Sequence, residues 1–171
     1  MQSHIDEYIA KGYSVIENAP SNIGSTILVD AAAERVVKFS QDRAYDKFAR
    51  YARDNPNSRL PKIFAHNEYD DDSFAVSNSW YTVTEMEYLE RLTDDEASDV
   101  EAWIARLFAA LRSGTQWDEL VDDPLDLLDA IRQLRDCARS TGTCLDVLKA
   151  SNYMARASEG ARRVVVTDPF N

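Results

Sequence analysis

The chain has 171 residues, and 19 Lys and Arg against 30 Asp and Glu give a formal net charge of −11 at pH 7. That length suits one compact domain, in which two small lobes are possible. Hydrophobic residues make up 44% of the chain and charged residues 29%, the balance of an ordinary soluble globular protein, while five Gly and five Pro exclude a collagenous or low-complexity chain.

The charge and the hydrophobic pattern exclude several classes of partner. A net charge of −11 repels phosphate backbones and anionic lipid, so direct binding of nucleic acid or of a membrane surface is not expected. No apolar run approaches the roughly 18 residues of a membrane span. Residues 1–8 contain neither a cationic flank nor an apolar stretch, so we expect no secretory signal and a cytoplasmic location.

The cysteines and histidines do not form a recognisable site. Cys137 and Cys144 are widely spaced and no histidines cluster with them, which excludes a structural zinc site and makes reduced thiols the expectation. His4 and His66 have no sequence partners that would make a Ser–His or Cys–His nucleophile pair.

The first half of the chain is predicted to be rich in β-structure. An amphipathic helix is predicted over residues 2–11, with Gly12 ending it. The β runs that follow favour an antiparallel meander and then two further strands; they span residues 13–16, 26–29, 35–39, 61–64 and 80–84. Helical spacing interrupts them over residues 42–54. The acidic residues 70–72 are expected to form a solvated turn.

The second half is predicted to be mostly helical. One helix is expected from Asp94 to Arg112, where Trp103 and Phe108 share an apolar stripe and are assigned to the core. A second is expected over residues 122–139, with Pro124 near its first turn. Residues 144–154 are interpreted as irregular, and residues 163–167 as a last strand. The order predicts an α+β fold with a lobe boundary near residues 87–92.

Polar residues at three places become informative when they are taken together. Lys38 lies at the end of a β run, just before a helix. Asp146 and Asn152 follow a long helix, and Asp168 directly follows the last β run. Phosphoryl transfer from ATP uses a strand lysine that positions phosphates, a loop Asp that orients the acceptor hydroxyl, and an Asn and an Asp that hold Mg²⁺ through oxygen atoms.

The residues around these positions resemble a known family. The stretch LDVLKASNYMAR, from Leu145 to Arg156, and the later VVVTDPF at 164–170 resemble the catalytic core of the protein kinase-like fold. They are most similar to the divergent serine/threonine kinases of podovirus-type bacteriophages, which have a Thr-Asp-Pro metal motif. Upstream, residues 36–38 resemble the strand that carries the kinase lysine, and residues 84–89 resemble the hinge between the lobes.

The resemblance implies a single, reduced, two-lobed kinase-like domain over residues 1–171. Residues 1–88 would form an antiparallel β-rich N-terminal lobe, and residues 89–171 a mostly helical C-terminal lobe that ends just after the metal motif. The implied cofactors are ATP and Mg²⁺.

The resemblance also implies a role for each matching residue. Lys38 would position the phosphates, Asp146 would be the catalytic aspartate, and Asn152 and Asp168 would hold Mg²⁺. Asp46 would replace the glutamate that pairs with the strand lysine, with Asp42 as the rival. The remaining nucleotide contacts would come from the loop and the hinge, at Gly24, Ser25, Glu85 and Glu87.

The sequence departs from the kinase pattern at several points. Asn152 lies six residues after Asp146 instead of five, no His or Arg precedes that Asp, and residues 20–25 contain one Gly. The chain ends three residues after Asp168, without the activation loop and later helices of a substrate platform. Either the acceptor is recognised unusually, or a partner completes the lobe, or the fold no longer catalyses.

Three functions are therefore considered. The first is an ATP- and Mg²⁺-dependent phosphotransferase, of phage type as the resemblance implies, that acts on a host or partner protein. The second is a non-catalytic pseudokinase or acidic inhibitor that occupies a basic site on a host enzyme by electrostatic steering. The third is phosphoryl transfer to a small molecule or nucleotide. The oligomeric state is left open.

Overall fold

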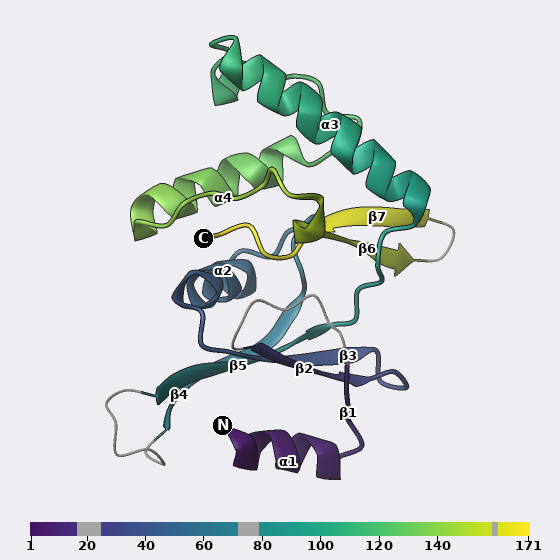
Figure 1. The fold of residues 1–171 in the computed structure, drawn as a ribbon, viewed down its shortest axis with the longest axis vertical. Coiled ribbons are helices and arrows are strands. Elements are labelled where there is room, and N and C mark those ends of the chain that lie inside the picture. The colour runs from purple at the N-terminus through teal and green to yellow at the C-terminus, as the bar shows by residue number, and fades with distance from the viewer. Residues whose placement is uncertain (17–24, 72–78, 159–160) are drawn as a thin grey trace. The chain divides into compact units, whose positions relative to one another are not determined.

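The computed structural model describes residues 1–16, 25–71, 79–158 and 161–171. Within these residues the chain has a five-stranded antiparallel sheet, a two-stranded hairpin and four α-helices, so the α+β class predicted from the sequence is confirmed (Figure 1). The kinase-like architecture stays a prediction. The chain divides into two compact units: the first contains Met1–Asn55 and Lys62–Tyr88, and the second contains Pro56–Pro61 and Leu89–Asn171.

The first unit is built on the five-stranded sheet. Its strands have the order β1-β2-β3-β5-β4, and each neighbouring pair is antiparallel. The predicted meander of the first three strands is confirmed. The strands are β1 (Ser14–Val15), β2 (Ser25–Asp30), β3 (Arg35–Ser40), β4 (Ile63–Asp71) and β5 (Ser79–Glu87).

The acidic stretch predicted as a turn belongs in part to a strand. β4 continues through Asp70 and Asp71, which pair with Trp80 and Ser79 of β5. Asp has a low intrinsic strand propensity, but pairing with a neighbouring strand overrides it. The turn prediction is therefore wrong for these two residues, and Asp72 lies outside the described residues.

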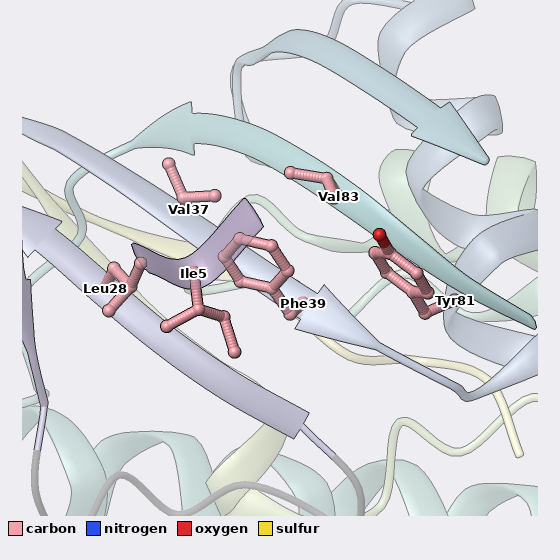
Figure 2. Packing of buried hydrophobic residues seen from close by; sticks show 6 residues of the cluster. All are labelled: Ile5, Leu28, Val37, Phe39, Tyr81 and Val83. Atoms are coloured by element: carbon pink, nitrogen blue, oxygen red, sulfur yellow. The ribbon is translucent and has the colours of Figure 1, made fainter. Parts of the chain in front are cut away.

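Helix α1 (Gln2–Ala10) covers one face of the sheet. Its one buried residue, Ile5, packs in a core cluster with alternate residues of the strands, as the two-residue period of a strand requires. Figure 2 shows this cluster, which is completed by Leu28, Val37, Phe39, Tyr81 and Val83. The helix ends at Lys11, and Gly12 follows with a positive φ of 99°, which confirms the predicted end.

Helix α2 (Arg43–Asp54) covers the opposite face of the sheet (Figure 1). Asp42 caps it, because its carboxylate accepts hydrogen bonds from the backbone N–H groups of Ala44 and Tyr45. The predicted apolar stripe is confirmed, and the same face also buries one charged residue, Asp46. The apolar residues of the stripe are Tyr45, Phe48, Ala49 and Ala52.

The second unit contains two long helices and a β-hairpin. Helix α3 (Asp94–Arg112) begins in a capping box formed by Thr93 and Glu96. The other elements are the short 3₁₀ helix η1 (Trp117–Glu119), helix α4 (Leu128–Thr141), the 3₁₀ helix η2 (Ala150–Asn152), and the hairpin strands β6 (Tyr153–Ser158) and β7 (Ala161–Val166). Within the described ranges, no helix is long and apolar enough to cross a membrane.

Helix α4 starts six residues later than predicted. Asp126 has a φ of 56°, a left-handed conformation that cannot continue an α-helix. The carboxylate of Asp123 accepts hydrogen bonds from the backbone N–H groups of Leu127 and Leu128 and so satisfies the true first turn. Pro124 therefore precedes the helix. The predicted end is confirmed, since Gly142 closes α4 with a φ of 67°.

Two further predictions about the second unit are wrong. The prediction of irregular structure over residues 144–154 is wrong for its last two residues. They begin β6, which pairs with β7 from Tyr153↔Val166 to Ser158↔Ala161. Phe108 was assigned to the core, but it is 45% exposed. Helix α3 instead buries the neighbouring stripe of Val100, Trp103 and Leu107.

Residues 56–61 separate from the first unit because their backbone is bonded to the second. The backbone N–H of Val166 donates to the carbonyl of Arg59 at 2.9 Å, and Arg156 donates to the carbonyl of Leu60 at 2.7 Å. Arg59 also forms an ion pair with Asp126 at 2.9 Å. Leu60 is fully buried and anchors the segment.

Two isoleucines of α1 provide a matched test of the sheet core. Ile5 is 6% exposed and Ile9 is 46% exposed. We expect Ile5→Ala to lower the free energy of unfolding by about 2–4 kcal/mol, through lost burial and a residual cavity. Ile9→Ala should change it by less than about 1 kcal/mol. Urea denaturation of both variants measures the difference, and equal losses would show that α1 does not pack on the sheet through Ile5.

Candidate functional site

A row of three polar side chains crosses the sheet of the first unit. In the strand register Lys38 of β3 lies opposite Thr84 of β5, and Thr84 lies opposite His66 of β4. Residues directly opposite in a sheet point to the same face. Val37 and Val83, one residue before Lys38 and Thr84, belong to the cluster under α1. The row therefore lies on the α2 face.

His66 is the most enclosed member of this row, with a side chain that is 0% exposed. Its Nδ1 lies 2.8 Å from the hydroxyl of Thr84, and its Nε2 lies 2.9 Å from Oδ1 of Asp46. An ionised carboxylate can only accept a hydrogen bond, so Nε2 carries the proton and Nδ1 accepts from Thr84. Both ring nitrogens of the buried imidazole are thereby satisfied.

Burial decides the protonation of this imidazole. It lowers the pKa of His66 below its ordinary value of 6.5, because a charged ring is costly in an apolar interior. The hydrogen bond and ion pair with Asp46 oppose that shift, while the positive charges of Arg50 and Arg53 add to it. His66 is thus a neutral histidine at neutral pH.

Asp46 joins this row to the surface of α2. Its Oδ1 also accepts a hydrogen bond from Nε of Arg50 at 2.9 Å, one helical turn along. Arg50 continues to Glu68 of β4 at 2.7 Å. The predicted ion pair between Asp46 and Lys38 is not found among the described residues, since the carboxylate of Asp46 forms an ion pair with Arg50 and accepts a hydrogen bond from the neutral ring of His66.

Lys38 lies against the aromatic face of α2. Its Nζ is 3.6 Å from the ring centroid of Tyr45, a cation–π contact at a residue that is 2% exposed. The rival partner Asp42 uses its carboxylate as the cap of α2. A strand lysine on a covered face is the type of cation that positions phosphate groups.

The other predicted nucleotide contacts lie at different places in the first unit. Gly24 lies outside the described residues. Ser25 begins β2, and its hydroxyl lies 3.2 Å from that of Ser40. Glu85 is one residue beyond Thr84, so its side chain points to the α1 face, where the phenol of Tyr8 donates to it.

The side chains of Glu85 and Glu87 each have a hydrogen-bond partner within the first unit. Burial and the neighbouring Glu85 carboxylate raise the pKa of Tyr8, which keeps this phenol a donor. Glu87 accepts a hydrogen bond from the backbone N–H of Lys62 at 2.7 Å. Their main-chain groups are engaged as well, because β5 lies between β3 and β4, and the backbone N–H of Glu87 donates to the carbonyl of Lys62 at 3.0 Å.

In the second unit, the tail of the chain holds the loop of residues 144–152, which we call the Asp146 loop. Cys144 and Asn171 exchange two backbone hydrogen bonds, at 2.9 and 3.0 Å, and Leu145 forms a β-bridge with Phe170. The backbone N–H of Asp146 donates to the carbonyl of Pro169 at 2.6 Å. Asp146 is thus bonded to the residue next to Asp168.

Asn152 ties the loop to the tail from the other side. Its amide nitrogen donates to the backbone carbonyl of Asp146 at 2.6 Å. Its own backbone carbonyl accepts from the backbone N–H of Thr167 at 2.8 Å and from the Thr167 hydroxyl at 3.2 Å. These bonds bring Asp146, Asn152 and the segment around Asp168 together in one cluster.

The six-residue spacing in the Asp146 loop is accommodated by the 3₁₀ turn η2, which ends at Asn152. Within the loop, Lys149 forms an ion pair with Asp146, whose side chain is 19% exposed. The buried Tyr153 donates to the carbonyl of Val147 at 2.7 Å. Burial, with a contribution from Asp146, raises the pKa of Tyr153, so this hydrogen bond persists at any physiological pH.

The donor atoms of this cluster suit a hard cation. The hydrogen bond through the amide nitrogen of Asn152 leaves Oδ1 as its potential ligand atom, and Asp168 offers a carboxylate. Mg²⁺ is typically bound by one or two protein oxygens together with substrate phosphates. Groups of three or more His, Cys, Asp or Glu that could hold a metal are absent from the described residues, so a dedicated all-protein cage is not found there.

Sequence reasoning missed His66 and Thr84. His66 lies twenty residues from Asp46 and eighteen from Thr84. The available signal was the alternation of β4, in which His66 shares a face with Glu68. That alternation places His66 on a face, but the identity of the covering helix residue is a tertiary property.

Comparison with known proteins does not identify a family for this chain. No protein-family model matches the chain, and no curated protein matches it significantly. Function is therefore argued from the geometry of the two units.

The buried histidine makes stability depend on pH. Because the pKa of His66 is lower in the folded state than the ordinary 6.5, the unfolded chain binds more protons as the pH falls. The stabilising contribution is complete above pH 6.5 and is lost below it, by at most about 1.4 kcal/mol per pH unit for one proton. Urea denaturation between about pH 7.5 and about pH 5.5 measures this loss.

Two variants separate this effect from that of other groups. His66→Gln should unfold more easily at neutral pH and lose stability less steeply on acidification. His4→Gln removes the other histidine of the chain and should keep the steepness of the parent. If the His66 variant keeps the full acid dependence, titration of this imidazole is not its source.

Proposed function

We propose that the chain is an ATP- and Mg²⁺-dependent phosphotransferase with a two-lobed, kinase-like fold that acts on a partner protein. The observation that carries the proposal is the Asp146 loop, in which the Asn152 amide bonds the Asp146 carbonyl and the backbone is tied to residues 167 and 169. A loop Asp, a loop Asn and an Asp after a strand, held in one cluster, are the residue types this chemistry uses.

The first unit supports the proposal independently. It carries Lys38 on an antiparallel strand, on the face that α2 covers. The His66–Asp46 hydrogen bond, at 2.9 Å, joins α2 to β4 and so fixes the helix over this face. A lysine with little freedom is suited to position phosphates, because catalysis of this kind is mainly positioning and charge neutralisation.

The proposed reaction assigns a task to each residue. The acceptor hydroxyl oxygen forms a bond to the γ-phosphorus, and the bond between that phosphorus and the β–γ bridging oxygen breaks. Asp146 accepts the hydroxyl proton. Asn152 and Asp168 would hold Mg²⁺, which supplies charge neutralisation at the phosphates when it is bound. Lys38 would contact the phosphates of ATP.

A second candidate is a non-catalytic binding protein, and the net charge of −11 favours it. A compact acidic surface can occupy a basic site on an enzyme. Such a complex would weaken steeply with added salt and would be insensitive to ATP.

Calorimetric titration with ATP and Mg²⁺ tests the first candidate. We expect saturable binding that requires Mg²⁺ and that weakens by at least about tenfold in Asp168→Ala and in Lys38→Ala. The matched controls are Asp136→Ala on the exposed side of α4 and Lys62→Ala before β4, and both should bind as the parent does.

A phosphate-transfer assay completes the test. Asp146→Asn should keep nucleotide binding and lose transfer, because it removes the proton acceptor and keeps the shape. Absence of binding at millimolar ATP, or equal binding by all four alanine variants, would set phosphoryl transfer aside and leave the acidic binding protein as the candidate.

A further inference from the structure

Helix α3 carries two apolar stripes, and the second unit buries one of them. Val100, Trp103 and Leu107 are at most 4% exposed. The ring of Trp103 meets that of Tyr153 edge to face, with centroids 6.4 Å apart. The second stripe runs through Ile104 and Phe108 and is rotated toward solvent, with Phe108 45% exposed.

This second stripe forms one wall of a shallow groove of about 430 Å³. The opposite wall comes from the Asp146 loop, at Leu148 and Ala150, and Leu148 is itself 40% exposed. The lining of the groove is completed by Glu101 and Ala105 of α3. Large apolar side chains that are exposed on both walls of one groove are typical of an interaction surface.

The charge around the groove selects the kind of partner. Glu101 lines one end, and the preceding part of α3 carries four more carboxylates, at Asp94, Asp95, Glu96 and Asp99. Of these five, Glu96 forms an ion pair with Arg162, whereas the described part of the chain shows no ion pair for the other four. The cations on α3 are Arg106, which pairs with Asp122 at 2.7 Å, and Arg112, which lies over the ring of Phe108 at 5.5 Å from its centroid. On the other wall, Lys149 pairs with Asp146.

We propose that this groove docks a basic amphipathic segment of a partner protein. An apolar anchor of that segment would lie between Phe108 and Leu148, and its Lys or Arg side chains would face Glu101 and the acidic first half of α3. A second copy of this chain is a poorer occupant, because each copy carries a net charge of −11.

The inference goes beyond phosphoryl transfer and holds for a non-catalytic binding protein as well. If the chain transfers phosphate, the groove has a further consequence, because Leu148 is two residues from Asp146 in the same loop. A partner bound at Leu148 would then lie close to Asp146, the proposed proton acceptor. This would favour substrate proteins that carry a basic amphipathic segment near the hydroxyl that is phosphorylated.

A defined peptide tests the groove without knowledge of the natural partner. The probe is an amphipathic peptide of about 15 residues, with Leu at helical spacing and Lys elsewhere, labelled for fluorescence anisotropy. We expect saturable binding that weakens at least about tenfold in the double variant Phe108→Ser, Leu148→Ser. Glu101→Lys should weaken binding and reduce its dependence on salt.

A matched control separates loss of the groove from loss of exposed apolar surface. Val121 is 90% exposed and does not line the groove, so Val121→Ser should bind the probe as the parent does. Since all the substituted residues are exposed, each variant should unfold at the parent's temperature, and thermal unfolding checks this.

Several outcomes would overturn the proposal. They are equal binding by the double variant, equal binding of a peptide in which Glu replaces Lys, and no saturable binding at millimolar peptide. A concentration-dependent dimer of this chain that is lost in Phe108→Ser would assign the groove to a second copy instead. ATP titration of the same variants keeps this test separate from that of phosphoryl transfer, because the groove variants leave Lys38 and Asp168 intact.

Discussion

Buried polar groups need hydrogen-bond partners, and this requirement shapes each of the two units. The enclosed imidazole of His66 is satisfied at one nitrogen by Thr84 and at the other by Asp46. Those two bonds hold α2 against the sheet face that carries Lys38. In the second unit, the backbone of the Asp146 loop has its partners in residues 167–171. Without that tail, the loop would lose the bonds that hold Asp146 and Asn152 near Asp168.

The same requirement distinguishes rigid positions from adaptable ones. Asp146 and Asn152 are held through main-chain atoms and one amide nitrogen, which leaves Oδ1 of Asn152 for a ligand, while the carboxylate of Asp146 is paired with Lys149. Asp42 is different, because its carboxylate is used by the first turn of α2. Phe108 of α3 and Leu148 of the Asp146 loop are exposed apolar side chains that line the groove. In the proposed function, phosphoryl transfer would thus use the hydrogen-bonded Asp146 loop, and the partner protein would bind in the groove.

Local signals were sufficient for most of the elements. The helix stripes, the acidic first turn that begins at Asp94, and Gly12 and Gly142 placed α1, α2 and α3 and the end of α4, because these effects act within a few residues. The start of α4 and strand β6 were missed. The first depends on the left-handed Asp126, and the second on pairing with β7. Neither follows from the period of the hydrophobic residues.

The amino-acid sequence by itself determined the residue types of the candidate site: Lys38 on a strand, and Asp146, Asn152 and Asp168 near the end of the chain. It also determined the acidic net charge of −11, from which direct binding of nucleic acid or anionic lipid is not expected. Only the tertiary structure decided the contacts. Asp46 binds His66 and Arg50, and Phe108 faces solvent at the groove. The reason is that periodicity assigns a residue to a face, whereas its partner is set by the strand register and helix packing of segments far apart in the chain.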